Sequence, residues 1–321
     1  MQTLRARHDP ALTARVVRSV PLLYAEGAYA PLDRPAHVRS ASGIVRVAGR
    51  IAVIQDDANF VALVDPATGF AHAVTLPAGE GGLRQFDDLR GNKRFKLDLE
   101  CCVSVDAGGG REMLVAFGSG SLPARERIVL VRGVGTGDPG VRVIDASALY
   151  AALHADREFS GSELNVEGAA VLDGTLRLFN RGNGAPRGDL LPVNASCDLE
   201  LASVLRGSVP PLRNVVQYDL GDVGGLPLTI TDVAVSGDAL LYSAAAEDSP
   251  DATRDGPVAG CAIGIIAGDS VRFGRVMGID GRPYQGKIEG ILPLSSERLL
   301  AVVDPDDPRV PSTLLELQLS P

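Results

Sequence analysis

The chain has 321 residues, of which 45% are hydrophobic and 22% are charged, and its formal net charge is −9. This composition excludes a disordered chain and supplies enough apolar side chains for a sizeable buried core. The negative charge argues against nucleic acid as a partner, because phosphate backbones are bound by clustered Lys and Arg. It favours cationic partners such as metal ions instead.

The N-terminal segment 1–8 has no apolar run of the kind found in signal peptides, and no later segment has the length and apolarity of a membrane span. We therefore expect a cytoplasmic protein. The four cysteines, Cys101, Cys102, Cys197 and Cys261, show no C-x-x-C spacing. They are expected to be small buried apolar residues rather than zinc ligands.

Five segments of the chain share one pattern: a polar residue, a short apolar run, a turn, a second apolar run, and then an acidic or polar loop. The residues that open these segments are Ser42, Glu100, Glu167, Thr231 and Glu289. They follow one another at intervals of roughly 60 residues, which is long enough for four strands and their loops. The repeat predicts an all-β protein, a five-bladed β-propeller of four antiparallel strands per blade, formed by residues 1–321 as a single domain.

The expected outer strands are, in chain order, 60–65 and 70–76 in the first repeat and 127–132 and 141–145 in the second. The third repeat has 190–193 and 198–201, with 214–219 following. The fourth has 261–266 and 271–276, and the fifth has 313–319. The fifth repeat is short by one strand, whereas the N-terminal run 14–22 belongs to no repeat. We expect this N-terminal strand to close the last blade, which would hide the exposed edges. One short helix is predicted before the third blade, at 145–156, with Asp145 as its cap.

The residue that opens each innermost strand is expected to lie beside the propeller axis. Three glutamates held together there repel one another, and each ionised group raises the pKa of its neighbours. A hard cation with oxygen ligands removes this repulsion, and calcium accepts irregular shells that include hydroxyls. The absence of His and Cys disfavours zinc. We therefore predict one calcium ion on the axis, with the ligands Ser42, Glu100, Glu167, Thr231 and Glu289.

A second interpretation needs no metal, because Lys96 and Lys287 precede two of these glutamates and can supply counter-charge. The loop after the second strand of each blade returns to the same face, so a shared ligand-binding surface is expected there. Its predicted ligand-binding residues are Asp56, Lys96, Asn180, Arg181 and Lys287, with Arg181 as the anion-binding group. The expected partner is a small anionic molecule, and the oligomeric state is left open.

The stretches 164–171 and 178–183 resemble an uncharacterised bacterial propeller family related to phytase-like and esterase-like propellers. The blade-by-blade pattern is also similar to the calcium-activated nucleotidases (apyrases), which are five-bladed propellers around one calcium ion. The calcium shell of that family has Ser, Glu, Glu, Ser and Glu in successive blades. The present chain matches it in type and order, with Thr231 in place of the second Ser.

The resemblance implies a calcium-dependent hydrolase of a small anionic ester or phosphoester. The ion would polarise a phosphate oxygen or a bound water. Asp57 or Glu100 would accept the proton, and Arg181 would steady the anion. The family carries tryptophans beside its site, whereas this chain has none, so a nucleotide base would lack its stacking surface. The alternative is a non-catalytic, metal-stabilised propeller that binds a ligand or protein through the loops of that face.

Overall fold

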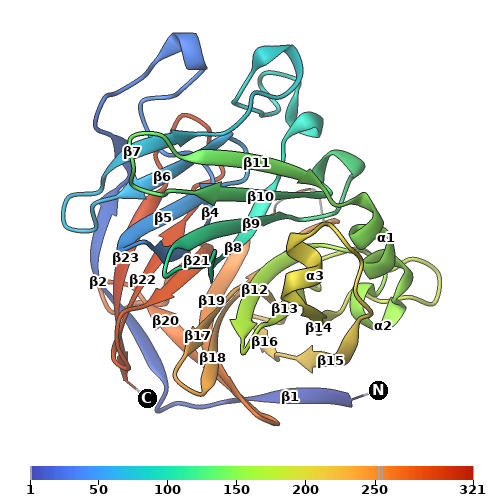
Figure 1. Ribbon diagram of the computed structural model, residues 1–321. Coiled ribbons are helices and arrows are strands. Elements are labelled where there is room, and N and C mark those ends of the chain that lie inside the picture. The colour runs from blue at the N-terminus through green and yellow to red at the C-terminus, as the bar shows by residue number, and fades with distance from the viewer. Residues whose placement is uncertain (1, 252–253, 255, 321) are drawn as a thin grey trace.

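The computed structural model describes residues 2–251, 254 and 256–320, and β-strands dominate this part of the chain (Figure 1). Most strands pair as antiparallel groups of four that follow the chain. The first group has the order β4 (Ala41–Val47), β5 (Arg50–Gln55), β6 (Phe60–Val64) and β7 (Phe70–Thr75), with the short β3 (Leu23–Tyr24) beside β7. The second group has the order β8 (Leu99–Asp106), β9 (Glu112–Gly118), β10 (Arg127–Arg132) and β11 (Gly140–Asp145).

The third and fourth groups follow the same rule. The third comprises β12 (Val166–Leu172), β13 (Thr175–Asn180), β14 (Asn194–Glu200) and β15 (Arg213–Asp219). The fourth comprises β17 (Leu226–Ser236), β18 (Ala239–Glu247), β19 (Val258–Ala267) and β20 (Ser270–Met277), with β16 (Asp222–Val223) beside β17. The expected strand 190–193 is wrong: that segment lies outside β14, whose hydrogen bonding to β13 begins at Ala195.

The last group is completed by the N-terminal part of the chain. It comprises β21 (Ile288–Pro293), β22 (Arg298–Val303), β23 (Thr313–Ser320) and β2 (Thr13–Pro21). β2 pairs antiparallel with β23, so the predicted closing strand is confirmed. An additional strand, β1 (Gln2–His8), was not predicted; it pairs in parallel first with β15 and then with β20. β1 and β2 thus join three groups into one fourteen-stranded sheet, and hydrogen bonding alone closes no ring.

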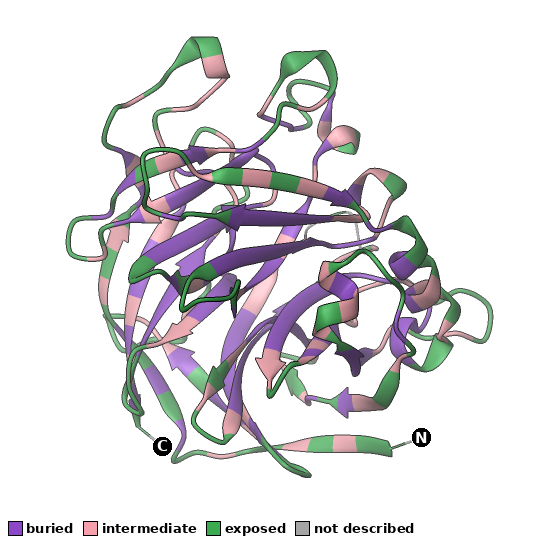
Figure 2. Ribbon diagram, in the orientation of Figure 1, coloured by how far each residue is buried: buried purple, intermediate pink, exposed green. Residues whose placement is uncertain are grey.

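The groups nevertheless follow one another in a cycle. The innermost strands lie against each other in the order β4, β8, β12, β17 and β21, and β21 lies against β4 again. Five buried hydrophobic clusters fill the spaces between successive groups, each with side chains from two of them. Figure 2 shows buried residues along the strands and exposed residues mainly in the connections. The four cysteines are free and buried, as expected.

The helices are short and lie in connections. α1 (Ser147–Ala155) is the predicted helix, but Asp145 ends β11 and its carboxylate accepts a hydrogen bond from Ser147 N (3.0 Å), whereas Ala146 is the cap residue. The prediction of a single helix is wrong, because α2 (Arg157–Ser160) and α3 (Leu201–Leu205) also occur. Four 3₁₀ turns complete the set: η1 (Ala30–Leu32), η2 (Glu80–Gly82), η3 (Lys93–Phe95) and η4 (Pro123–Arg125). No helix in the described part of the chain has the length and apolarity needed to cross a membrane.

Candidate metal and ligand site

The residues that open the five repeats occupy equivalent places in the structure. In each innermost strand, the pairing register shifts at one residue, and the residues skipped are Ser42, Glu100, Glu167, Thr231 and Glu289. A β-bulge of this kind turns a side chain out of the regular alternation of the strand. The chain therefore repeats one local irregularity five times and uses it to orient one polar side chain per group.

The two hydroxyl residues of this set tie neighbouring strands together. Ser42 Oγ donates a hydrogen bond to the carbonyl of Leu99, which directly precedes Glu100. Thr231 Oγ1 donates in the same way to the carbonyl of Ile288 (2.6 Å), which directly precedes Glu289. Both side chains are buried. Each hydroxyl thus fixes the backbone beside a glutamate of the next group.

Two of the three glutamates line a polar cavity that the loops of this face enclose. Its carboxylate residues are Asp56, Asp98, Glu100, Glu167, Asp304 and Asp306. Oxygens of Asp56, Asp98 and Glu100 lie within 4.8 Å of one another, close enough to share one ion. Carboxylate oxygens are the ligands that calcium and magnesium prefer. The structure therefore contains an acidic cluster that could hold a metal ion, at one side of the predicted ring.

Lysine and arginine side chains already neutralise part of this cluster. Lys96 Nζ lies 2.6 Å from Asp56 Oδ2 and 2.5 Å from Asp98 Oδ1. Arg125 Nη1 donates to Asp98 Oδ2 (3.0 Å). Burial by itself raises the pKa of Asp98, but the charges of Lys96 and Arg125 outweigh it and hold this pKa below its usual value. The ionised form of Asp98 is therefore favoured, whereas no lysine or arginine of the described residues forms an ion pair with Glu100.

Arg181 organises the other side of the cavity. Its guanidinium lies 3.3 Å from Glu167 Oε1, pairs with Glu247 at 2.5 Å, and donates to Thr229 Oγ1 (3.0 Å). Lys287 Nζ lies 2.8 Å from Glu289 Oε1 and 3.5 Å from Glu247 Oε2. Arg181 and Lys287 line the cavity, but both are buried and engaged with carboxylates. They act here as the counter-charges of the glutamates.

The carboxyl groups of this region outnumber the cations. The described residues that line the cavity or pair with its lining include six cations and eight carboxyl groups; the cations are Lys93, Lys96, Arg125, Arg181, Arg254 and Lys287, and the carboxyl groups are Asp56, Asp98, Glu100, Glu167, Glu247, Glu289, Asp304 and Asp306. Burial and neighbouring carboxylates raise the pKa of Glu100 and of Asp304 well above their usual values. Burial raises the pKa of Glu167 to about 7, against the opposing charge of Arg181. Carboxyl groups therefore outnumber cations among the described residues of this site, and this charge balance favours the binding of a further cation.

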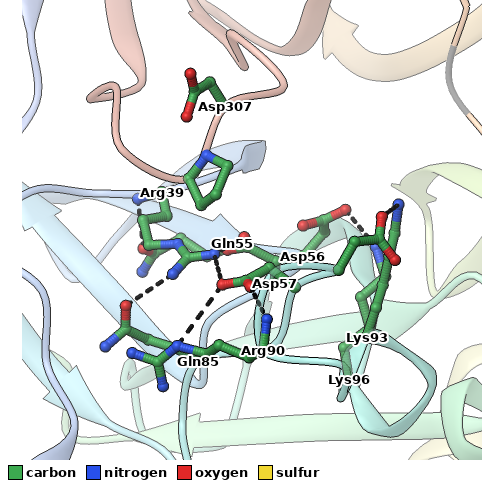
Figure 3. A network of polar contacts seen from close by, with 12 residues as sticks. Arg39, Gln55, Asp56, Asp57, Gln85, Arg90, Lys93, Lys96 and Asp307 are labelled. Atoms are coloured by element: carbon green, nitrogen blue, oxygen red, sulfur yellow. Dashed lines mark hydrogen bonds and ion pairs between the residues drawn. The ribbon is translucent and has the colours of Figure 1, made fainter.

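A second cleft, of about 330 Å³, adjoins the cavity, and the two share five lining residues: Asp56, Lys93, Lys96, Asp304 and Asp306. Asp57 lines this cleft, and its Oδ2 pairs with Arg39, a buried arginine that also bonds Asp87 (3.0 Å) and Gln85 (2.7 Å). Figure 3 shows this network, with Asp307 on the loop opposite. Burial and the charge of Asp56 raise the pKa of Asp57 to about 6. Asp57 thus lines the outer cleft and is absent from the residues that line the cavity with Glu100 and Arg181.

Asn180 has a structural role instead of a free amide. Its Oδ1 accepts a hydrogen bond from Asn165 N (2.7 Å), its Nδ2 donates to Val193 O (2.9 Å), and the residue is fully buried. Sequence reasoning missed Asp98, which lies between Lys96 and Glu100 in the chain and has a positive φ of 55°, so no strand alternation marks it. It also missed Arg39, which precedes β4, and Arg125, which precedes β10, because no repeated sequence pattern includes either residue.

The raised pKa values predict how the stability of the metal-free protein depends on pH. Folded Asp57 and Glu167, with pKa values of about 6 and about 7, bind protons that the unfolded chain, with 3.8 and 4.5, has released. The free energy of unfolding should therefore fall as pH rises from about 5 to about 8. Burial lowers the pKa of His37, and the titration of this single group acts in the opposite direction, raising the free energy of unfolding as pH rises. Melting temperatures in chelator across this range test the prediction, and Glu167→Gln should flatten the slope; a melting temperature that rises with pH contradicts it.

The fold and this site define an all-β protein with propeller-like strand groups and an acidic cluster in a cavity that loops enclose. Residues 37–319 match a family described as "Family of unknown function (DUF6929)", so the chain belongs to that family. No curated protein matches the chain by sequence.

Several solved structures are similar over almost their whole length. They include a glutaminyl cyclase from Myxococcus xanthus (12% identity, 99% of each chain, TM-score 0.48) and the α-L-arabinofuranosidase PaAbf62A from Podospora anserina (12% identity, 97% of this chain and 98% of that one, TM-score 0.44). The resemblance to phytase-like propellers and to calcium-activated nucleotidases remains a prediction from the sequence.

Proposed function

We propose that the five strand groups are the blades of a single-domain, five-bladed β-propeller that binds one divalent cation, preferably calcium, at its axis. The cyclic contacts of the innermost strands and the five equivalent bulges support the propeller. The observation that carries the metal is the group of carboxylate oxygens of Asp56, Asp98 and Glu100 within 4.8 Å of one another. Excess carboxylate and oxygen-only donors favour a hard cation.

Lys96 competes with the cation in this proposal, because its ammonium lies between Asp56 and Asp98. When an ion binds, this ammonium must give up at least one of the two carboxylates. Glu100, Glu167 and Asp304 line the same cavity and can complete the shell. Ser42 and Thr231, the hydroxyl members of the predicted ring, are not among the residues that line this cavity, and their hydroxyls bond the carbonyls of Leu99 and Ile288. The remaining member of the predicted ring, Glu289, is held by Lys287 at 2.8 Å and completes the shell only if that pair separates.

Calorimetric titration of the chelator-treated chain with calcium and with magnesium tests the proposal. We expect saturable calcium binding that Glu100→Gln weakens by roughly ten-fold or more, because the variant removes one charged ligand. Lys96→Met should strengthen binding, because it removes the competing ammonium. Glu297→Gln, the same change at an exposed residue away from the cavity, should have no effect. The axial site would be rejected if the wild-type chain gave no heat of calcium binding, or if Glu100→Gln bound calcium with unchanged affinity.

The geometry favours the non-catalytic form of this function, a metal-stabilised propeller whose face binds a ligand. The anion-binding role predicted for Arg181 would require its guanidinium to leave Glu167 and Glu247. Hydrolysis of a small anionic ester is the second candidate, and the pKa of about 6 for Asp57 favours it, because such a carboxylate is a suitable proton acceptor near neutral pH. Turnover of p-nitrophenyl phosphate or p-nitrophenyl acetate that requires calcium and is lost in Asp57→Asn would establish the second candidate over the first.

A further inference from the structure

A separate cavity of about 350 Å³ lies in the same set of loops, away from the acidic cluster. It is lined by the segment after β9, by α1 and α2 with the loop that follows them, and by the loops after β13 and β18. None of its lining residues belongs to the predicted metal ring or to the acidic cleft. The lining residues that matter for its chemistry are Ser121, His154, Arg157, Ser162, Glu163 and Arg187.

Ser162 is the unusual residue of this cavity. It is 4% exposed, and its hydroxyl has no hydrogen-bond partner within the described residues. A buried hydroxyl without a partner costs free energy, so it is expected to have one when a ligand is bound. The backbone holds it firmly: Ser162 N donates to Leu191 O (2.9 Å). The preceding Gly161 has a φ of 57°, and a Cβ there would lie 2.5 Å from that same carbonyl oxygen.

The lining holds two arginines, Arg157 and Arg187, and two carboxylates, Glu163 and Asp251, and the ion pairs of the described residues leave Arg157 without a carboxylate. Glu163 is paired with Arg187 at 2.5 Å, and Asp251, at the rim, is paired with Arg254 at 2.6 Å. Arg157, on α2, has no carboxylate within ion-pair distance in the part of the chain that the structure describes. The imidazole of His154 also lines the cavity, and its Nε2 donates to Gly120 O (3.1 Å). A free guanidinium and an unused hydroxyl donor at one cavity are typical of a site for an anionic oxygen group.

Ser121 adds a second hydroxyl on the side toward the centre of the face. Its Oγ accepts a hydrogen bond from Arg125 Nη1 (2.8 Å), the nitrogen that also donates to Asp98. The cavity is therefore joined to the acidic cluster by one short hydrogen-bond chain. Its volume exceeds what a lone tetrahedral anion fills, which leaves space for the organic part of an ester.

We propose that this cavity binds a small phosphorylated molecule, with Ser162 and Arg157 as the donors to its phosphate oxygens. The site is independent of the axial cation and so goes beyond the function proposed above. Its ligand chemistry is that of a phosphate group, either as the free anion or as a monoester.

The test is a calorimetric titration of the full chain, in chelator and at constant ionic strength, with inorganic phosphate, glucose 6-phosphate and glucose. We expect saturable binding of glucose 6-phosphate and no binding of glucose; binding of inorganic phosphate alone would assign the site to the free anion. Ser162→Ala should weaken binding by roughly ten-fold or more, since hydrogen bonds to charged groups are strong. The same variant should melt, without ligand, at a temperature equal to or above that of the wild type, because it removes a hydroxyl that has no partner.

Arg157→Met should weaken binding at least as much as Ser162→Ala. Arg142→Met, which removes the same charge from an exposed position on β11, is the matched control and should bind as the wild type does. The proposal is overturned if neither phosphate binds, if Ser162→Ala binds as tightly as the wild type, or if Arg142→Met loses as much affinity as Arg157→Met. Because calcium is absent throughout, failure here leaves the axial-cation proposal untouched, and failure of that proposal does not affect this titration.

Discussion

Replacing Arg181 by Met should lower the free energy of unfolding by about 3–5 kcal/mol, because removing one partner of a buried ion pair leaves uncompensated buried charge. Arg181 is 3% exposed, and its guanidinium is shared by Glu167 and Glu247, both buried. Met fills a similar volume, so the loss would report the charge rather than a cavity. Chemical denaturation in chelator measures it directly.

Two further variants make this result specific. Arg181→Lys keeps the charge but cannot bond Glu167, Glu247 and Thr229 at the same time, so an intermediate loss is expected. Arg206→Met removes an exposed arginine whose pair with Glu200 spans 4.0 Å, and this change should stay within about 0.5 kcal/mol of the wild type. If Arg181→Met is no more harmful than Arg206→Met, the network carries no net stabilisation.

The equivalence of the five bulged residues was predictable because it rests on local repetition. Each innermost strand carries the same polar residue, apolar run and turn, and aligned turns place Thr231, not Asp232, in the series. The structure gives Thr231 the bulge position, whereas Asp232 lies beneath it and accepts a hydrogen bond from Ile291 N (2.8 Å). Such a repeat can be detected in a sequence because the residues that form it are neighbours in the chain.

The counter-charges were only partly predictable, because they depend on contacts between distant segments. Lys96 and Lys287 lie close in sequence to Glu100 and Glu289, and both were predicted as neighbours of those glutamates. Arg181 pairs with Glu247 across 66 positions of the chain. Nothing in the residues around Arg181 distinguishes an anion-binding side chain from one committed to buried carboxylates.

The same reasoning explains the cavity around Ser162. Its lining comes from four connections of different lengths, and the free hydroxyl depends on how the loop after α2 packs on the segment near Leu191. β1 is a similar case, because alternating polar residues on an exposed strand give no apolar pattern to detect. β2, in contrast, alternates buried and exposed residues, and its buried side chains include Ala14 and Val16.

Val16→Asp should abolish folding or lower the free energy of unfolding by more than about 4 kcal/mol, whereas Val17→Asp should be tolerated. Val16 is 3% exposed in the cluster between the fourth and fifth groups, and Val17, its neighbour on β2, is 51% exposed. The first variant loses the burial of a valine, about 1.5–3 kcal/mol, and places a carboxyl group among apolar side chains. The second places the same carboxyl group in water.

This pair of variants tests whether the N-terminal strand closes the last group in solution. β2 covers β23, which would otherwise present an unpaired edge to other molecules. We therefore expect Val16→Asp to release β2 and to give aggregated protein or a sharply lower melting temperature, measured with Val17→Asp in parallel. Equal stability of the two variants would mean that β2 does not pack against β23 in this way, and the ring of five groups would then lack its closing strand.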